Sequence, residues 1–182
     1  MSLPRDMASP DNIFYINGIA FTKPEELGVE TEIDGSLSIL RLQNPDYPIE
    51  IHLLVGPFAD VIQNATATRL THYAPENGDL METTREILGR TFLGAVAADT
   101  EVDSGAEITA LIDKSGTNRE GCQYFEKSYL IMADQSVFES NVLLFDGNSD
   151  QVAVIGCRAS ALLQDQVEEW KDQILQDLHF VS

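Results

Sequence analysis

The sequence predicts an α+β protein: an antiparallel sheet with an N-terminal hairpin, a central helix, a four-strand meander and a C-terminal helix packed on the sheet. Apolar and polar residues alternate in segments such as Ile49–Val55, which is the period of a half-buried strand. Helical spacing of apolar residues replaces this alternation in the middle of the chain and after Asp165. The 182 residues are 43% apolar, enough for one buried core. We therefore expect a single domain over residues 13–182, preceded by a flexible polar lead-in over residues 1–12.

The first third of the domain has the pattern of strands. We expect a first strand over residues 13–21, with a bulge or bend at Gly18. Two alternating segments, Val29–Ile33 and Ser36–Leu42, flank Asp34-Gly35. An Asp-Gly pair favours a type I′ turn, because both central residues of that turn need positive φ. The sequence therefore predicts a hairpin here.

The middle of the chain has a helical pattern. One helical segment begins near Asp60 and is broken by Pro75 and by Asn77-Gly78. A second begins at Asp79 and ends near Gly94. One broken helix and two short helices fit this pattern equally well.

The β pattern then returns as four strands joined by turns, which predicts an antiparallel meander. Residues 113–121 are rich in turn formers and are expected to form a loop. The expected strands are Ile108–Ile112, Cys122–Met132, Val137–Phe145 and Val152–Ala159.

The chain ends in the clearest helical pattern. Asp165 and Glu168 have the spacing of a capping box. Lys171 is assigned to the polar outer face, and both helical regions are expected to cover one face of the sheet. The apolar stripe that would pack on the sheet is Val167, Trp170, Ile174 and Leu178.

The charge and the hydropathy exclude several function classes. There are 30 acidic and 11 basic residues, so the net charge is −19. Such a chain repels nucleic acid and anionic membranes. The longest apolar runs, such as Tyr129–Ala133, are far shorter than the ~20 residues that cross a bilayer. Residues 1–12 lack the apolar core of a secretory signal, so we expect a cytoplasmic protein.

Two acidic segments suggest cation ligands. Asp146, Asn148 and Asp150 have the spacing of the first three ligands of a calcium loop. The glycine and the glutamate that complete an EF-hand are replaced by Gln151 and Cys157, and the same residues favour an ordinary hairpin turn. The acidic run 99–103 is read as a solvated loop. We predict no metal site and no cofactor.

No nucleophile, phosphate-binding or zinc motif is present in the sequence. His52, His72 and His179 are too scattered for a metal site that sequence reveals, although His52 could pair with a neighbouring carboxylate. Cys122 and Cys157 are interpreted as reduced, buried thiols, with a disulfide between neighbouring strands left open. We therefore predict that the protein is not an enzyme.

Aromatic residues of the meander are the candidates for partner binding. Tyr124, Tyr129 and Phe138 form a binding surface if they are exposed on an uncovered sheet face, and belong to the core if they are covered. Trp170 is assigned to the core.

The order of elements from Ile13 to Phe180 resembles the Mog1p/PsbP-like superfamily. This resemblance implies a binding function, because the superfamily includes a Ran-binding factor, an extrinsic photosystem subunit and chaperones for secretion-system effectors. The size, acidity and α+β pattern also resemble type III secretion chaperones, although those usually begin with a dimer-supporting helix.

Two hypotheses follow from the sequence. The first is a non-enzymatic protein-binding module, an adaptor or a secretion or assembly chaperone, whose partner is a basic or partly unfolded protein. A homodimer through an uncovered sheet face is left open. The alternative is a small-ligand or divalent-cation-binding domain, or an enzyme with an unfamiliar site.

Overall fold

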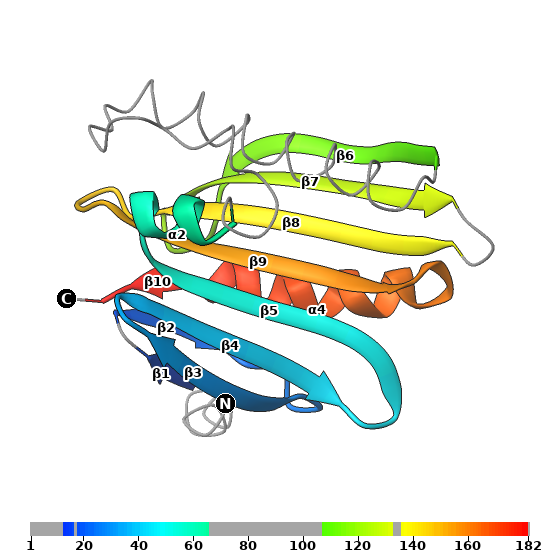
Figure 1. Cartoon of the computed structure of the whole chain (residues 1–182), viewed down its shortest axis with the longest axis horizontal. Coiled ribbons are helices and arrows are strands. Elements are labelled where there is room, and N and C mark those ends of the chain that lie inside the picture. The colour runs from blue at the N-terminus through cyan, green and yellow to red at the C-terminus, as the bar shows by residue number, and fades with distance from the viewer. Residues whose placement is uncertain (1–12, 17, 66–106, 133–135, 182) are drawn as a thin grey trace, which may run out of the picture.

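A long, twisted antiparallel sheet forms the centre of the molecule (Figure 1). The computed structural model describes residues 13–16, 18–65, 107–132 and 136–181. The lead-in, the second helical segment, His72 and the acidic run 99–103 lie outside these residues. The fold is α+β, as predicted, and the sheet makes up most of it.

Among the described residues, seven strands form the main sheet in the order β3-β4-β5-β9-β8-β7-β6, and three further described strands form a small sheet in the order β1-β2-β10. The strands are β1 (Ile13–Ile16), β2 (Ile19–Thr22), β3 (Gly28–Asp34), β4 (Leu37–Asn44), β5 (Tyr47–Pro57), β6 (Glu107–Thr117), β7 (Gln123–Met132), β8 (Val137–Phe145), β9 (Gln151–Ser160) and β10 (His179–Phe180).

The predicted meander β6-β7-β8-β9 is confirmed, and β9 continues the sheet by pairing with β5. One boundary was wrong. Residues 113–117 were expected in a loop, but they extend β6 and pair with residues 123–127. The turn is therefore confined to residues 118–121, where Gly121 has φ +85°. Tertiary pairing with β7 overrides the local turn preference of this segment.

Two N-terminal turns also differ from expectation. Residues 13–21 form a hairpin instead of one bent strand, because Gly18 has φ +88° and Ile16 pairs with Ile19. The second hairpin is confirmed, but Asp34 pairs with Leu37, so its turn lies one residue later than predicted. Gly35 supplies the positive φ of that turn, at +61°.

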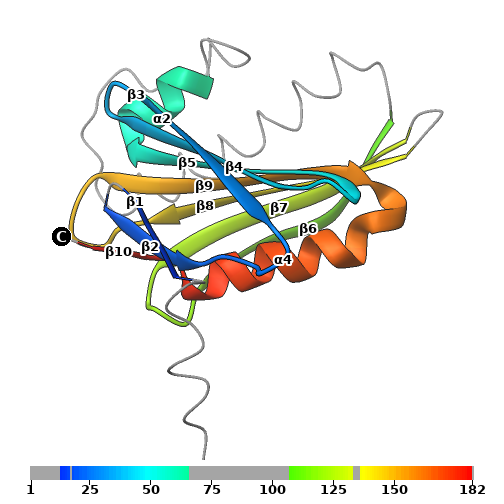
Figure 2. The same ribbon diagram turned by 90° about the horizontal axis from the view of Figure 1, so that it is seen from below.

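Helix α4 (Gln164–Asp177) covers one face of the sheet, which we call the helix face. Figure 2 shows the helix lying along this face. It contacts β9 and β2, and its predicted stripe is buried. The predicted capping box was wrong. Ser160 instead caps the short helix η3 (Ala161–Leu163), and α4 follows it with Leu163 at its N-cap and no side-chain cap. Asp165 lies inside the first turn, where its charge favours the helix dipole.

Helix α2 (Phe58–Ala65) lies on the opposite side of the sheet, which we call the groove face (Figure 2). Phe58 and Val61 pack there against Phe125 and Phe145. The expectation that both helical regions cover one face was therefore wrong. Strand residues alternate between the two faces of a sheet. Leu37 on β4 and Val152 on β9 also place apolar side chains on the α2 side, so at this end of the sheet both faces carry apolar side chains that a helix buries.

Candidate functional site

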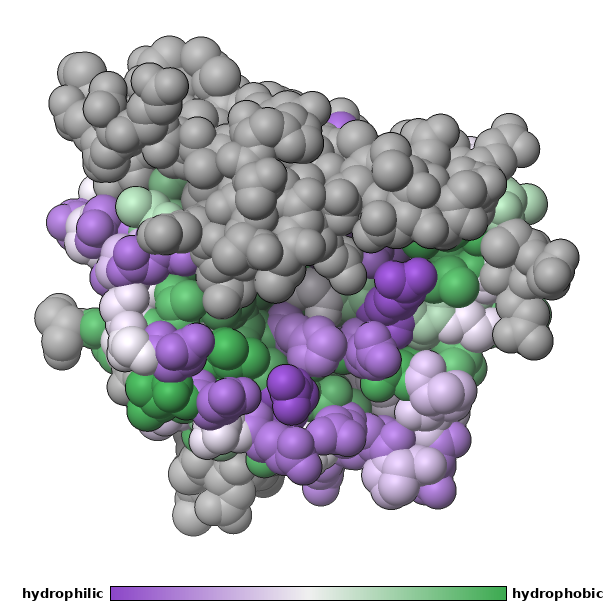
Figure 3. All heavy atoms as spheres, in the orientation of Figure 1, coloured by the Kyte–Doolittle hydropathy of each residue, from purple (hydrophilic) through white to green (hydrophobic). Residues whose placement is uncertain are grey.

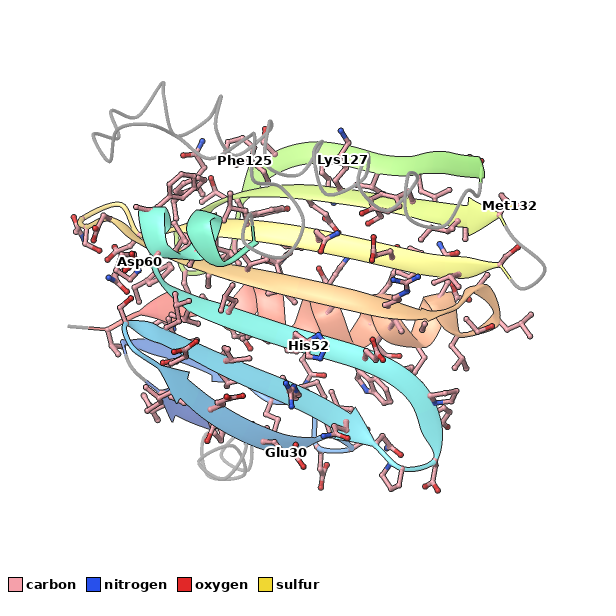
Figure 4. The ribbon with its side chains drawn as sticks, viewed as in Figure 1. Glu30, His52, Asp60, Phe125, Lys127 and Met132 are labelled. Carbon is pink, nitrogen blue, oxygen red and sulfur yellow. The ribbon has the colours of Figure 1, made fainter. Side chains whose placement is uncertain are left out.

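The groove face carries a polar strip beyond the end that α2 covers. Strand register places Glu30, Arg41 and His52 in one row across β3, β4 and β5. A second row contains Glu50, Arg158 and Glu139, across β5, β9 and β8. Charges of opposite sign face each other within both rows. Figure 4 shows Glu30 and His52 on this side of the sheet, and Figure 3 shows hydrophilic residues gathered over the same strands.

Four adjoining hollows follow this strip. Their volumes are about 240, 350, 270 and 550 Å³. Successive hollows share lining residues. Glu30 and Arg41 line both the first and the second hollow, His52 and Glu50 line both the second and the third, and Arg158 lines both the third and the fourth. Together they form a shallow channel, which we call the polar groove, running over β3, β4, β5, β9 and β8.

The 270 Å³ hollow in the middle of the groove has an unusual carboxylate. The side chain of Glu139 is 9% exposed, and its Oε1 lies 3.8 Å from Nη1 of Arg158. Its other oxygen, Oε2, is buried and has no hydrogen-bond partner among the residues that the structure describes. Most buried polar atoms in proteins have such a partner. This oxygen therefore lacks a donor, and Glu139 is one of the residues that line the hollow.

The neighbours of Glu139 shape the rest of this hollow. Asn141 donates from Nδ2 to the Tyr129 hydroxyl at 3.1 Å, which holds the amide in place. Gly156 lies between His52 and Asn141 in the register and leaves the floor without a side chain.

His52 is the titratable group most affected by this environment. Partial burial lowers the pKa of its imidazole below 6.5, and Arg41 acts in the same direction, while Glu50 opposes them. The ring is therefore mostly neutral at pH 7. The prediction that His52 lies on the polar face of its strand is confirmed, but the residues opposite it on the neighbouring strands are Arg41 and Gly156 and not a carboxylate.

A second polar cluster lies under α4 on the helix face. The Nζ atom of Lys171 pairs with Oε2 of Glu126, and both side chains are 4% exposed. Lys171 also donates to Ser140 Oγ at 3.1 Å, and Ser128 donates to the same hydroxyl at 2.8 Å. Sequence reasoning missed this cluster and assigned Lys171 to the outer face. The sequence did contain a signal for this cluster. Glu126 is a charged residue on the strand face that also carries Tyr124, and a carboxylate on such a face needs a partner of opposite charge.

The three aromatic candidates are all buried, so of the two alternatives that the sequence left open the structure supports the core and not an exposed binding surface. Tyr124 and Phe138 are 7% and 0% exposed and belong to the core beneath α4. Tyr129 points to the groove face but is 1% exposed. Their positions in long, paired central strands explain this burial. Trp170 is in the core, as predicted, and its ring meets Tyr47 edge to face.

The residues suggested as calcium ligands lie in the turn between β8 and β9. Asp146 accepts hydrogen bonds there from the Asn148 backbone N–H and from the Ser149 hydroxyl, at 3.1 and 2.6 Å. Asp150 contributes its backbone carbonyl, which accepts from Phe58 N–H at 2.8 Å. These contacts are those of a hairpin turn. In the described parts of the chain, no three His, Cys, Asp or Glu side chains are grouped to hold a metal ion.

Both cysteines are free, which answers the question that the sequence left open. Burial raises the pKa of the Cys157 thiol to about 12, and it also raises the pKa of Cys122. Both groups are therefore protonated and weakly nucleophilic near neutral pH.

The fold has solved counterparts. Cyanobacterial PsbP (CyanoP) from Synechocystis superposes with a TM-score of 0.55 at 11% identity, covering 90% of this chain and 87% of that one. The chain has the Mog1p/PsbP-like fold. The Ran-binding protein Mog1p of Saccharomyces cerevisiae superposes with a TM-score of 0.51 at 13% identity, with 91% of each chain covered. LpqN of Mycobacterium tuberculosis, which is involved in cell envelope biogenesis, superposes with a TM-score of 0.53 at 8% identity, covering 90% of this chain and 83% of that one.

No protein-family model and no curated protein matches the sequence. The order of elements was therefore sufficient to predict the fold, whereas the function needs a separate argument. Among the described segments, none of the helices has the length and apolar character needed to span a bilayer.

Proposed function

We propose that this protein is a non-enzymatic protein-binding module that holds an extended, basic segment of its partner in the polar groove. The observation that carries the proposal is the continuity of the four hollows across five strands. A small-molecule site is usually one deep, mostly apolar cavity. A long, shallow, polar channel instead suits a polypeptide.

The charges of the groove favour a basic segment. Glu30, Glu32, Glu50 and Glu139 contribute four carboxylates, whereas Arg41 and Arg158 contribute two guanidinium groups. The net charge of −19 adds a long-range attraction for cations. A cationic segment would therefore meet an acidic channel on an acidic protein.

The fold supports this proposal through a structural neighbour. One neighbour, Mog1p, is itself a Ran-binding protein. We further infer a cytoplasmic location, since both thiols are unpaired and an acidic, cysteine-poor domain suits a reducing compartment.

A charge-reversal pair tests the proposal. Glu30→Lys with Glu50→Lys changes two exposed groove residues, and Glu169→Lys with Asp172→Lys makes the same change in net charge on the outer surface of α4. Fluorescence anisotropy would follow an extended lysine- and serine-containing peptide binding to each variant. We expect the groove variant to lose binding and the helix variant to keep most of it.

Salt supplies the second readout. Binding should weaken from low to high ionic strength, because exposed charges are screened beyond about 10 Å at 0.1 M salt. Equal losses in the two variants would mean that only overall charge attracts the peptide. Undiminished binding by the groove variant would reject the groove as the site.

A further inference from the structure

The middle hollow of the groove has a specific chemical requirement. Oε2 of Glu139 is buried and has no hydrogen-bond partner in the described part of the chain, while Oε1 is 3.8 Å from Arg158, beyond ordinary hydrogen-bond length. A carboxylate held in this way is unfavourable unless a donor reaches it. The occupant that would satisfy it must donate a hydrogen bond.

The other groups lining the hollow define the charge of that donor. Glu50 and Glu139 provide two carboxylates against the single guanidinium group of Arg158, so the hollow has a net negative charge when His52 is neutral. Asn141 uses its amide nitrogen on Tyr129, and its Oδ1 is directed toward the space above Gly156. The net negative charge and this carbonyl oxygen therefore favour a positively charged nitrogen.

Gly156 leaves room for such a group. A Cβ atom built on this residue would lie 3.5 Å from Oδ1 of Asn141, an ordinary contact, and its φ is not in the left-handed region. A methyl group could therefore be accommodated, and the space it would occupy forms part of the 270 Å³ hollow.

We propose that this hollow binds the ammonium group of a lysine side chain of the partner segment, with Glu139 as its main acceptor. This inference rests on the proposed function, and it assigns the position in the groove at which a lysine side chain binds. A small free amine would present the same chemistry. The two sources are separated by the experiment.

The test is an NMR titration of the full chain with n-butylammonium chloride, with n-butanol as the neutral control of similar shape. We expect the ammonium compound to shift the backbone amides of Gly156 and Asn141, and butanol to leave them unchanged. Equal shifts with both compounds, or shifts located elsewhere, would overturn the assignment.

Variants locate the interaction. Glu139→Gln should weaken binding of the amine about tenfold to a hundredfold, the range expected for losing a hydrogen bond to a charged group. Glu169→Gln removes the same charge on the outer surface of α4, away from the groove, and should have little effect. Gly156→Ala should also weaken binding, since its methyl group fills the floor. Unchanged affinity in both Glu139→Gln and Gly156→Ala would refute the proposal.

A peptide arm separates this inference from the proposed function. The peptide is compared with its counterpart in which every lysine is Nε-acetylated. Groove binding of the unmodified peptide that survives Glu139→Gln would support a protein-binding module and overturn the lysine site, whereas equal binding of the acetylated peptide would reject positive charge as the basis of both proposals. Binding of butylammonium without any peptide binding would keep the cation site and reject the peptide groove.

Discussion

The buried ion pair under α4 should dominate the response of the fold to a single substitution. Lys171→Met removes the Nζ atom but keeps most of the side-chain volume, and it leaves the Glu126 carboxylate, 4% exposed, without its closest partner. Breaking a buried pair from one side costs about 3–5 kcal/mol. Lys114 approaches the other carboxylate oxygen at 3.6 Å and offsets part of this loss. We therefore expect a decrease of about 3 kcal/mol in the free energy of unfolding.

Urea denaturation followed by circular dichroism measures this value, with an unchanged m-value as the check that the unfolded state is the same. A decrease of about 3 kcal/mol corresponds to a fall in Tm of about 6–12 °C for a domain of this size. Lys114→Met is the matched control. Its side chain is 56% exposed, so we expect a loss below about 1 kcal/mol.

The double variant Lys171→Met with Glu126→Leu completes the test. Removing both charges eliminates the buried unpaired carboxylate, so the double variant should be more stable than Lys171→Met alone. A single variant that loses less than about 1 kcal/mol, or strictly additive losses in the double variant, would refute this reasoning.

Three further outcomes are expected. An NMR titration should give His52 a pKa below 6.5, and Glu50→Gln should lower that pKa further. Because the unfolded protein binds this proton more readily than the folded protein, its stability should rise with pH between the lowered pKa and 6.5. A measured pKa above 6.5 would contradict this. Asn118→Ala should cost about 2–4 kcal/mol by urea denaturation, because the buried amide donates to two backbone carbonyls at the end of α4, at 2.8 Å each, and accepts from two backbone N–H groups. A thiol reagent at pH 8 should react with Cys122 before Cys157, and rapid modification of Cys157 in the native protein would contradict its burial.

Local patterns in the sequence were sufficient for most of the strands. The four strands of the meander, β5 and the stripe of α4 all follow from periodicity, because burial of one side of an element repeats every two residues in a strand and about every 3.6 in a helix. The first hairpin could also have been predicted. Asn17-Gly18 is a strong signal for a two-residue hairpin turn, whereas the strand pattern of residues 13–21 favours a bulge or bend at Gly18 within one strand.

The sequence by itself determined that the chain is acidic, α+β and built around a meander. Those properties depend on composition and on neighbours along the chain. Only the tertiary structure decided that α2 and α4 cover opposite faces, and that Lys171 is buried against Glu126. It also brought Glu139 beside Arg158 and Gly156, from strands paired through register. The physical reason is that contacts between faces and across strands join residues distant in sequence, where no local pattern records which partner each side chain will meet.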